Sequence, residues 1–229
     1  MKSLFLLLPE GAEALFLFCL IMARIWAFNS LGVLTFFITV GLALIPIISW
    51  YAREYHIQKL SRHAVFQKLG LLPADFKKDR TVILLVFLVF YLATISMALK
   101  WNPNFIKQPY LDYQFLTHSI LYYPWALLQQ LWLNGYFVNR LEKVFKNAKI
   151  TSIAAGALFA IVHAPNPVLL VATFFGGITS AYFFQRNRNL YLLALLHVLL
   201  AISIKYFLPM EWHHNIRIGP GFTNWTLGD

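Results

Sequence analysis

Residues 117–136 read THSILYYPWALLQQLWLNGY, an apolar and aromatic stretch that contains two adjacent glutamines, Gln129 and Gln130. If this stretch is helical, at about 100° per residue, His118 and Gln129 share one face and Asn134 lies one turn after Gln130. Its length and hydropathy are typical of a helix that crosses a membrane. Polar groups in hydrocarbon are unfavourable unless they find partners, so the pattern predicts that the glutamines face other polar groups inside a bundle.

The composition of the whole chain also indicates a membrane protein. Of its 229 residues, 59% are hydrophobic and only 12% are charged, and the mean hydropathy is +0.63. An average soluble domain has about a quarter charged residues, so an ordinary soluble enzyme and a disordered chain are excluded. The single cysteine, Cys19, excludes a disulfide scaffold. Residues 1–229 are therefore predicted to form a single integral membrane domain.

Apolar segments of suitable length recur along the chain. A helix that crosses the bilayer needs about 20 mostly apolar residues. We therefore predict an all-α fold, a polytopic transmembrane helix bundle of about seven helices by this length criterion. The predicted spans, of which the fifth is short, are Pro9–Phe28, Leu31–Trp50, Thr81–Leu99, Thr117–Val138, Ile150–His163, Val168–Phe184 and Leu190–Leu208.

The distribution of basic residues predicts the orientation in the membrane. The net charge is +10, and most of the Lys and Arg residues fall within 51–80, 140–149 and 186–188. Cytoplasmic loops are enriched in Lys and Arg, so we expect a multi-pass topology with a cytoplasmic N-terminus and an extracytoplasmic tail at 209–229. Residues 51–80 are typical of a basic amphipathic cytoplasmic loop on lipid headgroups. Because membrane orientation accounts for the excess of bases, nucleic acid is not an expected partner.

Two acidic residues, Glu10 and Glu13, lie near the start of the first predicted span. The positive end of the helix dipole stabilises carboxylates in a first turn, and Pro9 is a favourable residue for opening a helix. We therefore expect both carboxylates in the first helical turn rather than in a buried functional site.

Two further apolar segments each contain a histidine. Phe159 and His163 lie four residues apart at the end of the fifth span, and His197 lies in the seventh span four residues before Ala201. One such histidine is usually a satisfied core residue, but two of them and a glutamine pair on three helices indicate one shared polar site. Residues with small side chains in the sixth span indicate close helix packing, namely Thr173, Gly176, Gly177 and Ser180.

These motifs, in this order, resemble the CPBP family of intramembrane glutamic endopeptidases, which includes CAAX prenyl proteases, bacteriocin-processing enzymes and Abi-type proteins. The family pattern is Glu-Glu-x-x-x-Arg on one helix, Phe-x-x-x-His on the next and His-x-x-x-Asn two helices on. Here Gln129-Gln130-x-x-x-Asn134 stands at the first motif, Phe159-x-x-x-His163 matches the second, and His197-x-x-x-Ala201 retains the histidine of the third. The resemblance places six residues at catalytic-motif positions: Gln129, Gln130, Asn134, Phe159, His163 and His197.

The departures from the family pattern bear on the chemistry. The resemblance implies a glutamate as the general base, which must accept a proton near neutral pH. The amide oxygen of Gln129 or Gln130 is far too weakly basic for this role, and Asn134 cannot supply the charge of the family arginine. We therefore predict a CPBP-type pseudoenzyme that lacks the standard glutamate protease chemistry and needs no cofactor. It would bind membrane lipid, a hydrophobic or prenylated peptide, or another membrane protein.

Two enzymatic alternatives stay open from the sequence. The chain could be a catalytically active intramembrane endopeptidase, or a membrane enzyme that uses a metal held by histidines. His118, His163 and His197, on separate helices, would suit zinc or iron and could activate water without a carboxylate. A plain transporter or structural bundle is less favoured, because paired intramembrane charges and broken-helix repeats are not evident.

Overall fold

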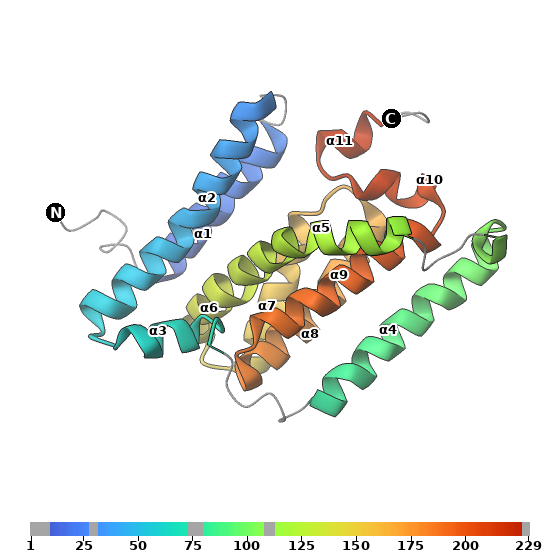
Figure 1. Ribbon diagram of the computed structural model, residues 1–229. Helices are drawn as coiled ribbons and strands as arrows, with labels where there is room; N and C mark the ends of the chain where they lie inside the picture. Colours follow the sequence, from blue (N-terminus) through green and yellow to red (C-terminus); the bar gives the residue numbers. More distant parts are fainter. Residues whose placement is uncertain (1–9, 28–31, 73–79, 108–112, 226–229) are drawn as a thin grey trace.

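The computed structural model of the chain describes residues 10–27, 32–72, 80–107 and 113–225, and all regular structure within these ranges is helical (Figure 1). This confirms the all-α helix bundle predicted from the sequence. The longer helices are α1 (Glu10–Trp26), α2 (Gly32–Ala52), α4 (Arg80–Trp101), α5 (Tyr113–Gln130), α7 (Ala148–Ile161), α8 (Pro167–Asn187) and α9 (Leu190–Phe207). The shorter elements are η2 (Arg53–Ile57), α3 (Arg62–Lys68), η3 (Phe105–Lys107), η4 (Leu131–Val138), α6 (Asn139–Phe145), α10 (Met210–His213), η5 (His214–Ile216) and α11 (Pro220–Thr223).

Each predicted span corresponds to a helix, although the fourth is longer than expected. There α5, the π-helix η4 and α6 follow one another without a break from Tyr113 to Phe145. Within the described residues, α4, α8 and α9 are long and apolar enough to cross a membrane. The ends of the first span, at Pro9 and Phe28, and the start of the second, at Leu31, lie outside the described residues. The number of crossings and their direction stay predictions.

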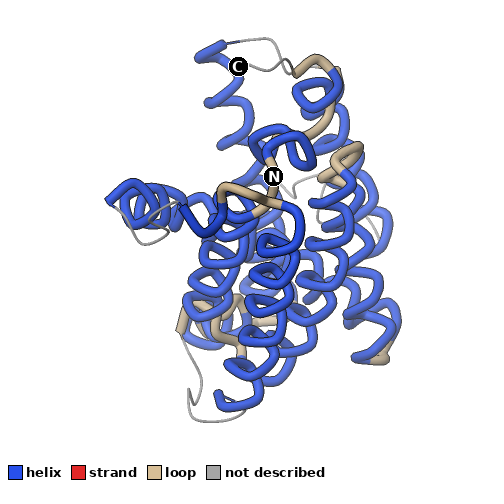
Figure 2. The backbone as a smooth tube through the Cα atoms, turned by 90° about the vertical axis from the view of Figure 1, so that its right-hand side faces the viewer, coloured by secondary structure: helices blue, strands red, loops and turns tan. Residues whose placement is uncertain are grey.

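Two close helix pairs form the inner bundle. α7 packs along α8 and α5 along α9, while α4 contacts α9 from the outside (Figures 1 and 2). Two glycines permit the first contact, because a Cβ added to Gly177 would lie 2.9 Å from the Cα of Gly156. A Cβ added to Gly176 would meet no atom within 4 Å. Of Gly176 and Gly177 in the predicted packing motif, only Gly177 is therefore required for the close contact between α7 and α8.

A buried ion-pair cluster joins the hairpin of α1 and α2 to the inner bundle. The carboxylate of Glu13 is fully buried, 2.9 Å from Arg53 Nη2 and 3.1 Å from Arg140 Nη2. The hydroxyl groups of Ser49 and Tyr136 also donate hydrogen bonds to Glu13, at 2.5 and 2.9 Å. The cluster thus joins α1, α2 and the segment after α5 through one carboxylate.

The cluster corrects the expectation for the first helix. Although α1 does begin at Glu10, Glu13 is not a carboxylate stabilised merely by the helix dipole, because two guanidinium groups neutralise it inside the protein. Arg53 and Arg140 had been assigned to cytoplasmic loops, yet both are buried. The side chain of Glu10 lies outside the description.

A second carboxylate cluster brings the predicted cytoplasmic segments together. Glu54, just after α2, pairs with Lys68 at 2.9 Å and with Lys143 at 2.5 Å. Burial raises the pKa of the Glu54 carboxyl, but the hydrogen bonds and charges of the two lysines outweigh burial and leave the pKa below its usual value. Arg188 pairs with Glu142 at 2.8 Å. Residues from 51–80, 140–149 and 186–188 therefore meet at one end of the bundle.

The residues after α9 fold back over the other end of that helix. The side-chain amide of Asn166, in the link between α7 and α8, donates hydrogen bonds to the backbone oxygens of His213 and Arg217 at 2.8 and 3.0 Å. The backbone N–H of Gly219 donates to the Ala164 oxygen at 2.8 Å. The described part of 209–229, predicted as a tail, is thus a folded cap on the helix ends.

The buried Glu13 cluster predicts a large effect on stability. Glu13→Gln removes the negative charge that two buried guanidinium groups contact, which should cost about 3–5 kcal/mol. For a chain of this size, the melting temperature in detergent should fall by about 10 °C. Glu211→Gln, at an exposed carboxylate, should change it by less than about 2 °C. Equal melting temperatures for the two variants would show that the cluster is not a stabilising link.

Candidate functional site

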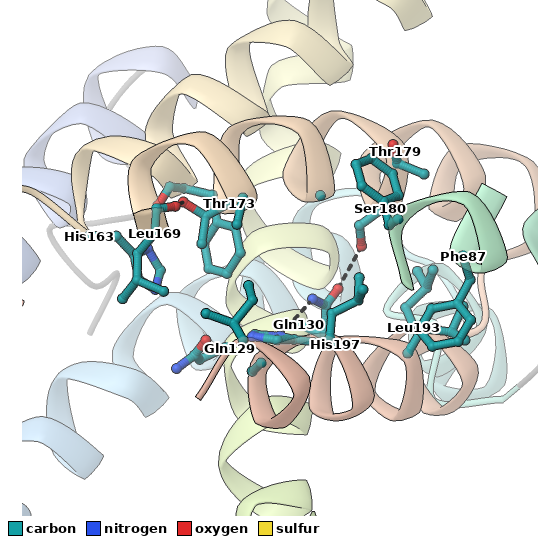
Figure 3. Close-up of a pocket in the computed structure, with 18 of the residues that line it drawn as sticks. Phe87, Gln129, Gln130, His163, Leu169, Thr173, Thr179, Ser180, Leu193 and His197 are labelled. Atoms are coloured by element: carbon teal, nitrogen blue, oxygen red, sulfur yellow. Dashed lines mark hydrogen bonds between the residues drawn. The ribbon is translucent and has the colours of Figure 1, made fainter. Parts of the chain in front are cut away.

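A cavity of about 250 Å³ lies among α4, α5, α7, α8 and α9. The four polar residues that were expected to converge, Gln129, Gln130, His163 and His197, all line it (Figure 3). They come from three separate segments, since the glutamines end α5, His163 follows α7 and His197 lies mid-way along α9. The predicted convergence on one internal site is therefore found.

Gln130 is the centre of a hydrogen-bond network that joins three helical segments (Figure 3). Its amide nitrogen donates to Nδ1 of His197 at 3.1 Å. Its amide oxygen accepts from Asn134 Nδ2 at 2.6 Å and from Ser180 Oγ at 2.7 Å. Asn134 is fully buried and also donates to Ser180 at 2.8 Å. Every member of this network is formally uncharged when His197 is neutral.

The hydrogen bonds determine which nitrogen of each histidine carries the proton. His197 Nδ1 accepts from Gln130, so the neutral ring carries its proton on Nε2. His163 Nδ1 lies 2.6 Å from the backbone oxygen of Phe159, which can only accept, so Nδ1 of His163 is protonated and Nε2 has a free lone pair. The edges and faces of the Phe159 and histidine rings meet, with centroid distances of 4.8 Å to His163 and 5.7 Å to His197. In their neutral forms, His197 therefore has an unused donor at Nε2 and His163 an unused acceptor at Nε2.

Gln129 contributes a buried acceptor. Its Oε1 is inaccessible to solvent and has no hydrogen-bond partner in the described structure. Gln129 also lines a second cavity, of about 100 Å³, between α1 and the inner bundle, together with Trp125 and His163. Buried polar atoms without partners are rare in folded proteins, so this oxygen suggests a position at which a ligand donor could bind.

The rest of the lining is predominantly apolar. Ile83, Phe87 and Phe90 of α4 face Leu193 and other aliphatic residues of α8 and α9 across the cavity. The lining of the described cavity contains no Asp, Glu, Lys or Arg side chain. A polar end formed by amides and imidazoles thus continues into a hydrocarbon-like chamber.

The remaining sequence candidates lie in different places. Asn134 stands behind Gln130 rather than in the lining, and Ala201 lines the cavity without a polar group. His118 is exposed and its Nδ1 is hydrogen-bonded to the hydroxyl of Tyr206, away from the lining. The structure therefore does not bring His118 to the other two histidines. Within the described ranges, there is no group of three or more His, Cys, Asp or Glu side chains that could hold a metal.

Sequence reasoning missed two features of the site. Ser180 had been considered only as a small packing residue, yet its hydroxyl completes the Gln130 network. Ile216 and Ile218 of the C-terminal cap close part of the cavity. A serine within a small-residue motif was a signal for the first, since its hydroxyl needs a partner in the membrane. Nothing in the local pattern indicates the second.

The arrangement limits the chemistry of the site. A carboxamide cannot hold the proton taken from water, so neither glutamine can act as general base. The site can instead donate and accept hydrogen bonds at one end of an apolar chamber. These properties suit the binding of a neutral or amphiphilic molecule.

Part of the chain matches a known family model. Residues 124–203 match the family model described as type II CAAX prenyl endopeptidase Rce1-like. The matched segment extends from the middle of α5 to most of α9 and contains both glutamines and both cavity histidines. No curated protein and no solved structure matches the chain.

The uncharged network predicts strong coupling between positions 130 and 134. Asn134→Arg alone would place a guanidinium in a fully buried neutral network and should destabilise the protein by about 3–5 kcal/mol. Adding Gln130→Glu supplies a carboxylate within one helical turn, so the double variant should recover about 2 kcal/mol of that loss in denaturation in detergent. Gln114→Arg, at an exposed position of α5, serves as the control. Strictly additive effects of the two substitutions would contradict direct contact between them.

Proposed function

Because residues 124–203 of this membrane protein match the family model of type II CAAX prenyl endopeptidases, we propose that the chain is a CPBP-type protein that uses that framework to hold an apolar ligand without hydrolysing peptides by glutamate chemistry. The proposed ligand is a lipid or prenyl chain that enters from the surrounding membrane. In this proposal five of the six motif residues line a binding site rather than a catalytic centre, and Asn134 supports Gln130 from behind.

The observation that carries the proposal is the state of the Gln130 amide. Its nitrogen is engaged with His197 and its oxygen with Asn134 and Ser180. No acidic side chain lines the described cavity to replace the missing carboxylate. Loss of general-base catalysis alone typically lowers a rate by about 10²–10⁴, and the loss of the arginine charge adds to this.

The apolar chamber supports a hydrocarbon ligand over a peptide. Its volume of about 250 Å³ is at the small end for ligand sites. Its walls are mainly aliphatic and aromatic side chains of α4, α8 and α9, and α8 adds the hydroxyl groups of Thr173, Thr179 and Ser180. Burying an alkyl chain there is favourable by about 25 cal/mol per Å² of apolar surface. An extended peptide would require many more backbone hydrogen-bond partners than this chamber offers.

A cavity-filling substitution tests the proposal directly. The probe is an 18-carbon alkane that carries a photoreactive diazirine, incorporated into phosphatidylcholine nanodiscs with the protein. A side chain at Gly176 would extend into the cavity without meeting another atom near its Cβ. Gly176→Leu should therefore lower labelling of the cavity peptides at least about threefold by mass spectrometry, because it removes apolar contact volume from the ligand.

Gly41→Leu is the matched control. A Cβ at Gly41 also meets no atom within 4 Å, but Gly41 lies on α2 away from the cavity lining. Labelling of the cavity peptides should be unchanged in this variant. Labelling that is spread over the outer helix faces and is insensitive to Gly176→Leu would contradict ligand binding in the cavity. Cleavage of a prenylated peptide by the unmodified protein, abolished by His163→Ala, would contradict the loss of protease chemistry.

A further inference from the structure

The polar residues at one end of the cavity indicate which head group its ligand carries. This inference rests on the proposed function. Three atoms at this end have hydrogen-bonding capacity that the described structure does not use. His197 Nε2–H is a donor, because Nδ1 of that ring accepts from Gln130. His163 Nε2 is an acceptor, because Nδ1 of that ring donates to Phe159. Gln129 Oε1 is a second acceptor without a partner in the described structure, and because it is inaccessible to solvent, the Gln129 side chain has to turn towards the cavity to bind a ligand.

The three residues that carry these atoms line the same cavity. Gln129 and His163 line both the main cavity and the smaller one beside α1, and His197 lines the main cavity only. The ring of Phe159 contacts both histidine rings and so keeps them on a common surface. Figure 3 shows His163 and Gln129 on one side of Gln130, and Phe87 and Leu193 on the other, where Thr179 and Ser180 also lie.

The charge state of this end excludes an ionic head group. No Lys, Arg, Asp or Glu lines the described cavity. Burying a carboxylate or an ammonium ion without a partner of opposite charge is highly unfavourable in a low-dielectric site. The positions that carry charge in the family pattern hold amides here, so the ligand that fits best is itself uncharged.

We propose that the cavity binds a neutral single-chain acyl amphiphile whose head group carries one carbonyl oxygen and two O–H or N–H donors. The carbonyl accepts from His197 Nε2–H, one donor binds His163 Nε2, and the other binds Gln129 Oε1. The part of the acyl chain next to the head group occupies the apolar chamber, whose volume of about 250 Å³ is smaller than a whole 18-carbon chain. Monoacylglycerols and N-acyl ethanolamines share this chemistry and are the two sources of such a ligand.

The Gln130 network explains why His197 is the hydrogen-bond donor at this end of the cavity. The Gln130 oxygen accepts from two donors, so the Gln130 nitrogen must face His197, and a neutral His197 must then carry its proton on Nε2. Asn134 and Ser180 therefore act as positioning residues, because they fix the direction of a hydrogen bond that the ligand receives from His197.

Competition against the diazirine alkane in nanodiscs tests the head-group assignment. Four competitors share one 18-carbon acyl chain: the monoacylglycerol, the N-acyl ethanolamine, the methyl ester and the free carboxylate at pH 8. The fifth is the 18-carbon primary amine, which is a cation. The monoacylglycerol or the N-acyl ethanolamine should compete at about tenfold lower concentration than the methyl ester, which lacks both donors. The carboxylate and the amine should be weaker by about 100-fold, because their charge would be buried without a partner.

Variants assign each contact to its atom. Gln129→Leu and His163→Phe should each weaken competition by the monoacylglycerol about fivefold while leaving the methyl ester unchanged, since only the former has donors. His197→Phe should weaken both compounds, since both have the carbonyl. Gln114→Leu and His63→Phe, at exposed positions of α5 and α3, should change neither.

The outcomes separate this inference from the proposed function. If all five competitors displace the alkane equally, the cavity binds apolar chains but the head-group assignment is wrong. A preference for the carboxylate or the amine would also overturn the assignment. If the alkane itself does not label the cavity in a way that depends on Gly176, the proposed function fails first, and the head-group inference fails with it.

Discussion

The hydrogen bond from the Gln130 amide to His197 Nδ1 is the interaction on which the site depends. It joins α5 to α9, and through Asn134 and Ser180 the same amide is joined to η4 and α8. A carboxylate at this position would accept from all its neighbours and would favour a charged imidazole. The amide instead provides a donor to His197 and an acceptor to Asn134 and Ser180, so the network carries no formal charge when His197 is neutral, and Asn134 Oδ1 is its one buried atom without a partner in the described structure. The chemistry of the cavity follows from this single difference.

The protein does contain buried charges, but they lie outside the cavity. Glu13 meets Arg53 and Arg140, and Glu54 meets Lys68 and Lys143, in clusters near the end of the bundle where basic segments gather. These ion pairs connect elements that are far apart in the sequence. The charged residues thus hold the helices together, whereas the cavity between α4, α8 and α9 has an uncharged lining. The polar residues that join the helices are therefore different from those that line the proposed ligand site.

Helix positions and the convergent site could be predicted because each depends on local pattern. Apolar length predicted the helices, and the cost of unpartnered polar groups in a membrane predicted that Gln129, Gln130, His163 and His197 share one site. The environment of Glu13 could not be predicted, since it depends on Arg53 and Arg140, which are about 40 and 127 positions away in sequence. The position of His118 likewise depends on Tyr206, 88 positions away. The C-terminal cap depends on Asn166, whose side chain binds backbone atoms that no sequence pattern identifies.

The protonation of the two cavity histidines is the most direct measure of the neutral network. Nitrogen-15 NMR of histidine-labelled protein in nanodiscs at neutral pH distinguishes the protonated from the unprotonated ring nitrogens. Substitution of His163 or His197 assigns the signals. The account predicts two neutral rings, with the proton on Nε2 in His197 and on Nδ1 in His163. A doubly protonated His197, or a His197 proton on Nδ1, would contradict the proposed direction of the Gln130 hydrogen bond and the binding site built on it.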